Sequence, residues 1–196
     1  MVVQGDLTGA TAVCEESLSF FREKGDIENA ARTLGNLGEI AYTQGLDDQV
    51  RVRVEEAIAL FHQIGARNGT LVGSLCLLGT VALRQGDRQE ARTRMAEGLK
   101  LALEIGESWS GANALEAWAS LCLAEEQAAQ ATLLLGAATQ TRDTLGAADN
   151  ADTHAKLEDH CAELKTALGE EEFARLWAEG QAITWQKAVE CALAGE

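Results

Sequence analysis

One stretch of the chain is written twice, and this duplication restricts the possible folds more than any other feature. Residues 34–45 carry the pattern Leu-x2-Leu-Gly-x2-Ala followed by Gln-Gly, and residues 75–86 repeat it 41 positions later. Each copy is followed by a further apolar stretch that ends in Ile-Gly, at residues 64–65 and 105–106. Apolar residues three and four positions apart lie on one face of an α-helix. A unit that recurs in register therefore predicts a stack of similar helical units.

A second apolar pattern alternates with the first and extends the repeat to four copies. Its members stand at positions i, i+4, i+7, i+8 and i+11, which is the spacing of one helical face. The sets are Ala10, Cys14, Ser17, Leu18 and Phe21; Val50, Val54, Ala57, Ile58 and Phe61; Ala91, Met95, Gly98, Leu99 and Ala102; and Ala131, Leu135, Ala138, Thr139 and Arg142. The last set departs from the pattern at Thr139 and Arg142.

Small residues recur on the partner helices, at Gly38, Gly79 and Ala119. A glycine inside a helix costs about 1 kcal/mol relative to alanine, so a repeated glycine indicates that two backbones approach closely there. The chain has no proline, and its glycines fall mostly between the apolar patterns. Gly45 and Gly86 are expected to end helices, and Asp87 with Glu90 is expected to cap the next one. An all-α fold follows.

Leu-x2-Leu-Gly-x2-Ala on one helix, with Ala91-x3-Met95 on the next, resembles the tetratricopeptide repeat. The resemblance implies an all-α, right-handed superhelical stack of antiparallel helix pairs, a tetratricopeptide-like α-solenoid with a C-terminal helical cap. The period here is 40 to 41 residues, whereas the standard repeat has about 34. Glycines stand where a closing proline is common, at Gly25, Gly65, Gly106 and Gly146. An armadillo or HEAT array would match the period but not the Leu-x2-Leu-Gly pattern.

The two ends of the chain lead to different expectations. Gln4-Gly5 matches the end of a first helix, so the first repeat is expected to be incomplete and the chain a fragment of a longer protein. Residues 1–148 are predicted to form the repeats, and residues 149–196 capping helices of the same domain. Those helices are expected at about 153–167, at 170–180 with Gly180 as the stop, and from Thr184 as a cap.

The ending itself carries a second resemblance. Leu168-Gly169, then Phe173, Trp177-Ala178-Glu179-Gly180 and Ala188-Val189 with Ala192-Leu193 is similar to the tail of LuxR-type and related signal-transduction ATPases of bacteria. Repeats and tail together cover nearly the whole chain. The resemblance implies a cytoplasmic transcriptional regulator whose nucleotide-binding and DNA-reading modules lie outside this chain.

The net charge and the distribution of cysteines limit the classes of function that are expected for the chain. The net charge is −15, and a surface of this sign repels the phosphate backbone, so direct nucleic acid binding by this segment is not expected. The acidity fits solubility or a docking surface for a basic partner. Five scattered cysteines without a C-x2-C pair indicate a reducing, cytoplasmic setting. No signal peptide is evident, and the longest uncharged run, residues 68–83, is too short to span a membrane.

Motifs of known chemistry are absent from the sequence. It contains no G-x4-G-K-[ST] phosphate loop and no G-x-S-x-G elbow. His154, Glu158, His160 and Cys161 do not all share one helical face, so an exposed helix is favoured over a metal site. We therefore predict no catalytic residue, no cofactor and no metal, and the chain is not expected to be an enzyme.

The resemblance to tetratricopeptide repeats implies a concave groove lined by the first helix of each pair. Its candidate ligand- or peptide-binding residues are Arg32, Asn36, Glu39, Tyr42, Thr80, Arg84, Asn113, Glu116 and Ser120. Arg32 and Arg84 have the chemistry to hold a carboxylate, and Asn36 and Asn113 that to bond an extended backbone.

Two functions are consistent with these patterns. The leading one is a non-enzymatic protein- or ligand-binding module, the C-terminal sensor or interaction region of a larger bacterial regulator, with a peptide, partner protein or small inducer in the groove. The alternative is a structural adaptor without a small-molecule ligand, which forms homo-oligomers through its incomplete first repeat.

Overall fold

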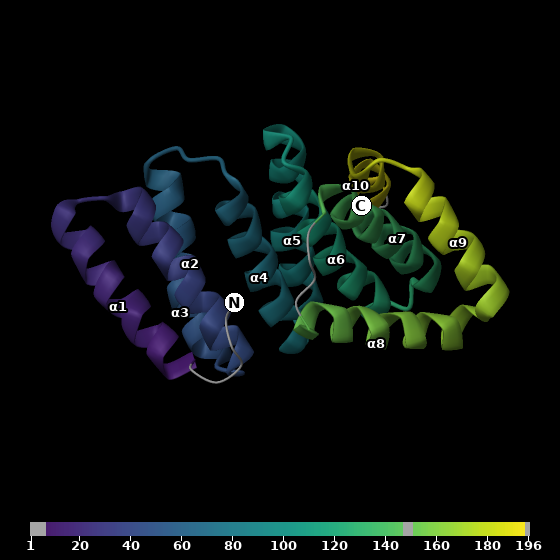
Figure 1. Ribbon diagram of the computed structural model, residues 1–196, viewed down its shortest axis with the longest axis horizontal. Helices are drawn as coiled ribbons and strands as arrows, with labels where there is room; N and C mark the ends of the chain where they lie inside the picture. Colours follow the sequence, from purple (N-terminus) through teal and green to yellow (C-terminus); the bar gives the residue numbers. More distant parts are fainter. Residues whose placement is uncertain (1–6, 147–150, 195–196) are drawn as a thin grey trace. The chain divides into compact units, whose positions relative to one another are not determined.

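The structure, a computed structural model, describes residues 7–146 and 151–194. These residues form ten α-helices and no β-strand (Figure 1), which confirms the prediction of an all-α fold. The helices are α1 (Leu7–Lys24), α2 (Ile27–Thr43), α3 (Asp47–Gln63), α4 (Gly69–Arg84), α5 (Arg88–Ile105), α6 (Ser108–Ala124), α7 (Ala128–Leu145), α8 (Ala151–Leu168), α9 (Glu170–Ala182) and α10 (Trp185–Leu193).

The chain divides into two compact units, unit 1 (Met1–Arg94) and unit 2 (Met95–Glu196), and the division falls within α5. The boundary predicted between repeats and capping helices, at residue 148, lies outside the described residues. Each unit has its own buried apolar core and is considered by itself below.

The helices begin and end at capping residues that can be recognised in the sequence. The Asp87 carboxylate accepts a hydrogen bond from the Glu90 backbone N–H at 2.9 Å, as predicted for the start of α5. The Thr184 hydroxyl likewise accepts from the Lys187 N–H at 3.3 Å at the start of α10. Gly86 has a φ of +84°, a conformation that glycine adopts without strain, and it follows the end of α4.

In unit 1, α2 packs against α1, α3 and α4. The predicted apolar face of α3 is buried along its whole length, from Val50 to Phe61. Gly38 explains how α3 comes so close, because a Cβ at this position would overlap Cγ2 of Val54. Gly38 therefore has the packing role predicted for it.

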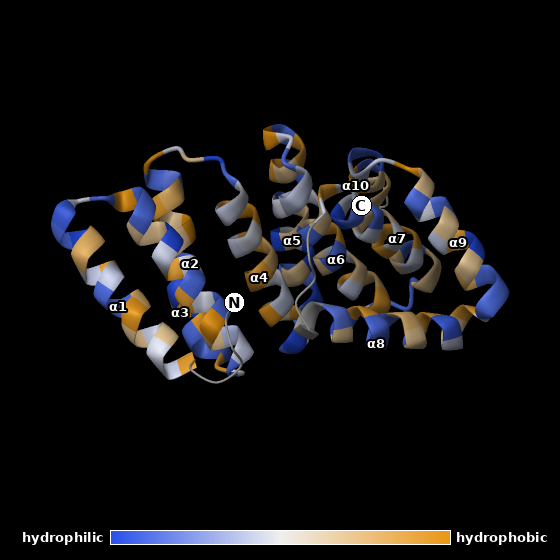
Figure 2. Cartoon of the chain, in the orientation of Figure 1, coloured by the Kyte–Doolittle hydropathy of each residue, from blue (hydrophilic) through white to orange (hydrophobic). Residues whose placement is uncertain are grey.

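On α1, the face that carries the same pattern is only partly covered. Cys14, Ser17 and Phe21 are half-buried, whereas their counterparts on α3 are fully buried. Hydrophobic and hydrophilic residues alternate along the turns of α1 (Figure 2), as in a helix with one buried face. Val13 and Phe20 add large exposed hydrophobic side chains to this helix.

In unit 2, α7 is the central helix and packs against α6, α8, α9 and α10. Its crossing with α9 brings two glycines together, since a Cβ on Gly136 would lie 2.6 Å from the Trp177 carbonyl oxygen. A Cβ on Gly180 would overlap the Leu133 carbonyl group. The prediction that Gly180 ends its helix is therefore wrong: α9 continues to Ala182, and Gly180 serves close packing instead.

The three helices expected in the C-terminal tail are present as α8, α9 and α10. The Trp185 ring of α10 lies where a side chain at Gly111 of α6 would be, so this glycine makes room for the aromatic ring. Among the described residues, no helix combines the length and the apolar character needed to cross a membrane.

Candidate functional site

Three of the residues predicted for a groove follow one another along α2 of unit 1. Arg32, Asn36 and Glu39 stand at i, i+4 and i+7, so they share one face of the helix. All three are exposed, while their neighbours Leu34 and Leu37 are buried in the core. The local sequence thus turns an apolar face towards α1 and α3 and leaves a polar stripe on the surface.

A hollow of about 120 Å³ lies beside this stripe, between α2 and α4. It is lined by Gly35, Asn36, Glu39, Thr70, Gly73, Ser74 and Leu77. Two of the predicted binding residues, Asn36 and Glu39, are therefore brought to one cavity. Arg32 lies on the same helix but is not part of the lining.

The hollow lies where two glycines, Gly35 and Gly73, leave space between the helices. A Cβ on Gly35 would stand 3.5 Å from Cγ2 of Thr70 and 3.6 Å from Oγ of Ser74, which is ordinary contact distance. A Cβ on Gly73 would meet nothing within 4 Å. The two glycines thus leave a space that alanines would begin to fill, and Ser74 is one of its lining residues.

Ser74 differs from the other hydroxyls of these helices. Its residue is only 4% exposed, and its side chain lines the hollow. Thr33 and Thr80, by contrast, donate to carbonyl oxygens of their own helices at 2.7 Å and 2.9 Å. The Ser74 hydroxyl lines the hollow, where water or a ligand can hydrogen-bond with it.

Arg84 and Tyr42, also predicted for the groove, contact each other at another place in unit 1. The Arg84 guanidinium lies 4.3 Å from the centroid of the Tyr42 ring. It also forms an ion pair with Asp47 at the start of α3. The charge of Arg84 is thus balanced within the unit, and a ligand carboxylate would compete with Asp47 for it.

In unit 2 the predicted residues Asn113 and Glu116 are joined by Arg142 of α7. The guanidinium donates to Asn113 Oδ1 and to Glu116 Oε2, both at 2.6 Å. It also lies 4.9 Å from the ring centroid of Trp109, whose side chain is exposed. Ser120, the third predicted residue of this unit, donates to the Glu116 carbonyl at 3.1 Å.

Sequence reasoning did not place Arg142 or Ser74 in a site, although signals for both existed. Arg142 is a cation at a register position that is apolar in the other copies, and the structure buries it to 7% exposure. Ser74 is one of the few polar residues in the uncharged run at 68–83. The partners of Arg142, Asn113 and Glu116, lie 29 and 26 positions away in sequence, so these contacts are not visible in the pattern.

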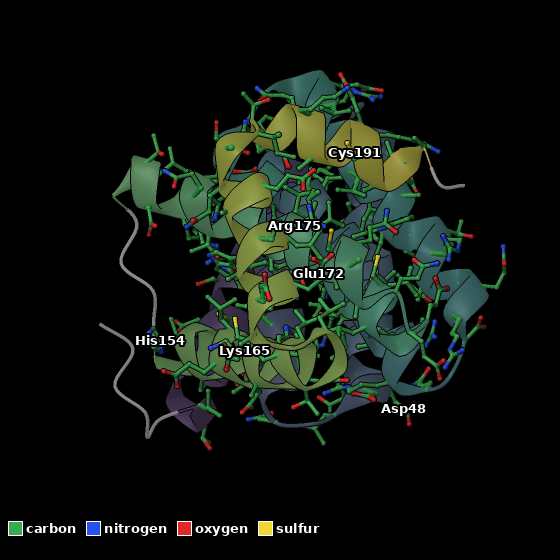
Figure 3. All side chains as sticks on the ribbon, turned by 90° about the vertical axis from the view of Figure 1, so that its right-hand side faces the viewer. Asp48, His154, Lys165, Glu172, Arg175 and Cys191 are labelled. Atoms are coloured by element: carbon green, nitrogen blue, oxygen red, sulfur yellow. The ribbon has the colours of Figure 1, made fainter. Side chains whose placement is uncertain are left out.

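A larger hollow, of about 470 Å³, lies at the start of α9 and is lined mainly by Glu170, Glu171, Glu172 and Arg175. Glu172 and Arg175 point from neighbouring turns of α9 (Figure 3) and are hydrogen-bonded at 2.7 Å. Their mutual contact raises the pKa of Arg175 and lowers that of Glu172. Glu170, Glu172 and Arg175 already form ion pairs, so this hollow is the weaker candidate.

Reactive and metal-binding side chains are dispersed. Among the described residues, no group of three or more His, Cys, Asp or Glu is arranged to hold a metal ion. His154 and Glu158 form a pair at 3.4 Å on the surface of α8, while burial lowers the pKa of His160. Burial raises the pKa of the Cys76 thiol to about 12, which keeps it protonated and unreactive at neutral pH.

No family model matches the chain, and no curated protein matches its sequence.

Proposed function

We propose that this chain is a non-enzymatic helical module that binds a small molecule or a peptide in the hollow between α2 and α4. One observation carries the proposal: a hollow of about 120 Å³ between α2 and α4 is lined by the polar side chains of Asn36, Glu39, Thr70 and Ser74. A concave site with a few convergent polar groups is the usual form of a ligand-binding site.

The module is proposed to be a tetratricopeptide-like stack of helix pairs with a right-handed superhelical path. Two facts support this architecture: apolar patterns repeat with a 41-residue period, and α2 packs between α1 and α3. In such a repeat, each helix pair presents one polar face to a ligand, and Asn36 and Glu39 lie on that face of α2.

In the cell, we propose that the module is the C-terminal sensor region of a larger, cytoplasmic bacterial regulator of the LuxR type. The resemblance of residues 168–193 to the tails of such regulators supports this role. Ligand binding at the hollow would then be passed to nucleotide-binding and DNA-reading modules elsewhere in the protein.

A thermal-shift screen with amino acids, amines, organic acids and short peptides tests the binding function. Compounds that raise the unfolding temperature are then measured by calorimetry against Asn36→Ala and Glu39→Gln. We expect either change to weaken binding by tenfold or more, because hydrogen bonds to a charged group contribute about 1.5–3 kcal/mol. Glu28→Gln is the matched control, since Glu28 is an exposed residue of α2 away from the hollow. Hits that bind Asn36→Ala and Glu39→Gln normally would refute the site.

Self-association is a second candidate function, and the exposed face of α1 favours it. Val13 is 64% exposed and Phe20 is 53% exposed, on a helix whose apolar face is only half covered. Exposed apolar surface of this kind promotes association. Sedimentation equilibrium over a hundredfold concentration range should show dimers that the double change Val13→Ser, Phe20→Ser removes. A monomer at every concentration would exclude this function.

A further inference from the structure

We propose that the outer face of α1 binds the same face of a second copy of this chain, with the two helices antiparallel. The outer face consists of Val13, Glu16, Phe20 and Lys24, which lie on one side of the helix. This contact rests on self-association, the second candidate function, and adds to it a surface, a symmetry and a set of contacts.

The outer face lies opposite the buried side of α1. Leu18 is 1% exposed and anchors the helix in the core of unit 1, whereas Val13 and Phe20 are largely exposed. These two apolar residues are separated by about two helical turns, so they lie on the same side of α1. Apolar side chains grouped on an exposed helical face favour contact with another protein surface.

The corresponding face of α3 is covered by neighbouring helices. α3 carries the same apolar pattern as α1, and it packs against both α2 and α4. In this register Phe20 corresponds to Leu60 of α3, and Leu60 is half-buried. A helix of a second copy would cover α1 in the way that neighbouring helices cover α3.

The Phe20 ring is ordered by its neighbours on α1. It packs edge-on against the Phe21 ring, with the ring centroids 5.6 Å apart and the planes at 70°. The Lys24 ammonium lies 5.7 Å from the Phe20 ring centroid. Because Phe21 is half-buried, the two rings extend the apolar surface from the core outwards. An ordered aromatic side chain loses less conformational entropy on association, so this ring suits the centre of an interface.

The charges on the edge of α1 that faces α3 are balanced within unit 1. Glu15 forms an ion pair with Arg53, and Arg22 forms one with Glu56. Together with the buried Leu18, these contacts set which side of α1 faces outwards. The outer face therefore has a defined direction, away from α2 and α3.

The two charges on the outer face suit a partner of the same sequence. Glu16 and Lys24 are exposed and lie four residues before and after Phe20. If two α1 helices cross antiparallel at Phe20, Glu16 of each copy faces Lys24 of the other, and two ion pairs form. In a parallel pair, like charges would face each other and repel. Charge complementarity therefore selects a second copy in antiparallel orientation, which is the isologous contact of a two-fold dimer.

The length of α1 limits the affinity. A helix of 18 residues is about 27 Å long at a rise of about 1.5 Å per residue. A contact made by one such helix from each copy is at the small end of protein–protein interfaces, so we expect a Kd of roughly 10–100 µM. The dimer should therefore form in concentrated solution and dissociate on dilution.

Sedimentation equilibrium of the whole chain measures this contact, in reducing buffer because Cys191 is exposed. We expect Glu16→Lys and Lys24→Glu each to weaken dimerisation by about tenfold or more, since either change places like charges at both ends of the contact. An equimolar mixture of the two variants should form a heterodimer with an affinity near that of the native dimer. One outer face in this mixture is positive and the other negative, so both ion pairs can form again.

Glu163→Lys is the matched control. Glu163 is an exposed glutamate within α8 of unit 2, so its replacement changes the net charge by the same amount as Glu16→Lys. This variant should dimerise like the native chain. Far-ultraviolet circular dichroism and the unfolding temperature show whether each variant is folded.

The outcomes are distinct. Loss of the dimer in both single variants and its return in their mixture would support the antiparallel contact. A dimer that persists in both variants would overturn this contact and leave self-association through another surface. A dimer lost in both variants and absent from their mixture would overturn the pairing of Glu16 with Lys24. A monomer at every concentration would remove the contact and the second candidate function together. The ligand binding proposed for the α2–α4 hollow is independent of all four results.

Discussion

Gly38 lies where α2 crosses α3, and a Cβ at this position would overlap Cγ2 of Val54. Gly73 lies in the second turn of α4, where a Cβ would meet nothing within 4 Å. Both are glycines inside helices of unit 1, so the intrinsic gain from a change to alanine is the same for both, up to about 1 kcal/mol. The difference between them therefore measures packing alone.

We predict opposite effects of these two substitutions. Gly38→Ala should lower the free energy of unfolding by about 1–2 kcal/mol, because overpacking costs about 1–3 kcal/mol and exceeds the gain in helix propensity. Gly73→Ala should raise it by about 0.5–1 kcal/mol. Urea unfolding followed by far-ultraviolet circular dichroism measures both. Equal changes in the free energy of unfolding would mean that α2 and α3 move apart at Gly38 to accommodate the added methyl group.

At the scale of helices, two ion pairs differ in burial. One joins α6 to α7, and the other joins neighbouring turns of α9. The side chains of Arg142 and Glu116 are 9% and 27% exposed, whereas those of Arg175 and Glu172 are 58% and 46% exposed. Water screens the second pair, so its contribution to stability is expected to be the smaller of the two. The first pair is also supported by Asn113 and by the Trp109 ring.

Double-mutant cycles should separate the two pairs. Arg142→Met with Glu116→Gln is predicted to give a coupling energy of about 1–3 kcal/mol, and Arg175→Met with Glu172→Gln a smaller one. Chemical denaturation of the single and double variants provides the numbers. A larger coupling for the α9 pair would contradict the prediction.

A further ion pair, between Arg51 of α3 and Glu90 of α5, makes unit 1 sensitive to acid. The Arg51 guanidinium bonds the Glu90 carboxylate at 2.7 Å and holds the pKa of this carboxyl below its usual value. A lowered pKa in the folded state adds stability above the unfolded pKa of about 4.3, and this stability is lost as the pH falls through the folded value.

Removing this carboxylate should reduce the fall in the free energy of unfolding at acidic pH. Between pH 5 and pH 3 we expect Glu90→Gln to lose about 0.5–1 kcal/mol less stability than the native chain, a magnitude typical of a partly exposed pair. Glu28→Gln is the control and should follow the native curve. Identical acid limbs for Glu90→Gln and the native chain would exclude a contribution from the pair.

Sequence patterns predicted the helices well because their causes are local. The apolar faces, the caps at Asp87 and Thr184 and the glycine that follows α4 all depend on residues within a few positions of one another. The hollow could not be predicted in the same way, since Gly35 and Ser74 meet only through the packing of α2 on α4. The prediction for Gly180 was wrong for the same reason, because the role of this residue depends on Leu133 of another helix.

At the scale of the whole chain, each unit contains one buried cysteine that reports on its core. Cys76 lies in unit 1 and Cys122 in unit 2, and both are buried, whereas Cys191 is exposed. A buried thiol reacts only after the surrounding structure opens. Thiol labelling therefore follows the opening of the two units separately in one experiment.

We predict that Gly38→Ala increases the labelling rate of Cys76 more than that of Cys122. The change weakens packing in unit 1, and opening free energies respond to the structure around each thiol. Mass spectrometry of peptides from a maleimide time course resolves the sites, with Cys191 reacting first in every sample. Equal acceleration at Cys76 and Cys122 would indicate that the units open together.

The division into two units also has an optical consequence. All four tryptophans of the chain, Trp109, Trp118, Trp177 and Trp185, belong to unit 2, and the single tyrosine, Tyr42, belongs to unit 1. Emission excited at 295 nm therefore originates from unit 2 alone, and a tryptophan replacing an exposed residue such as Arg32 would give unit 1 its own fluorescent reporter beside the α2–α4 hollow.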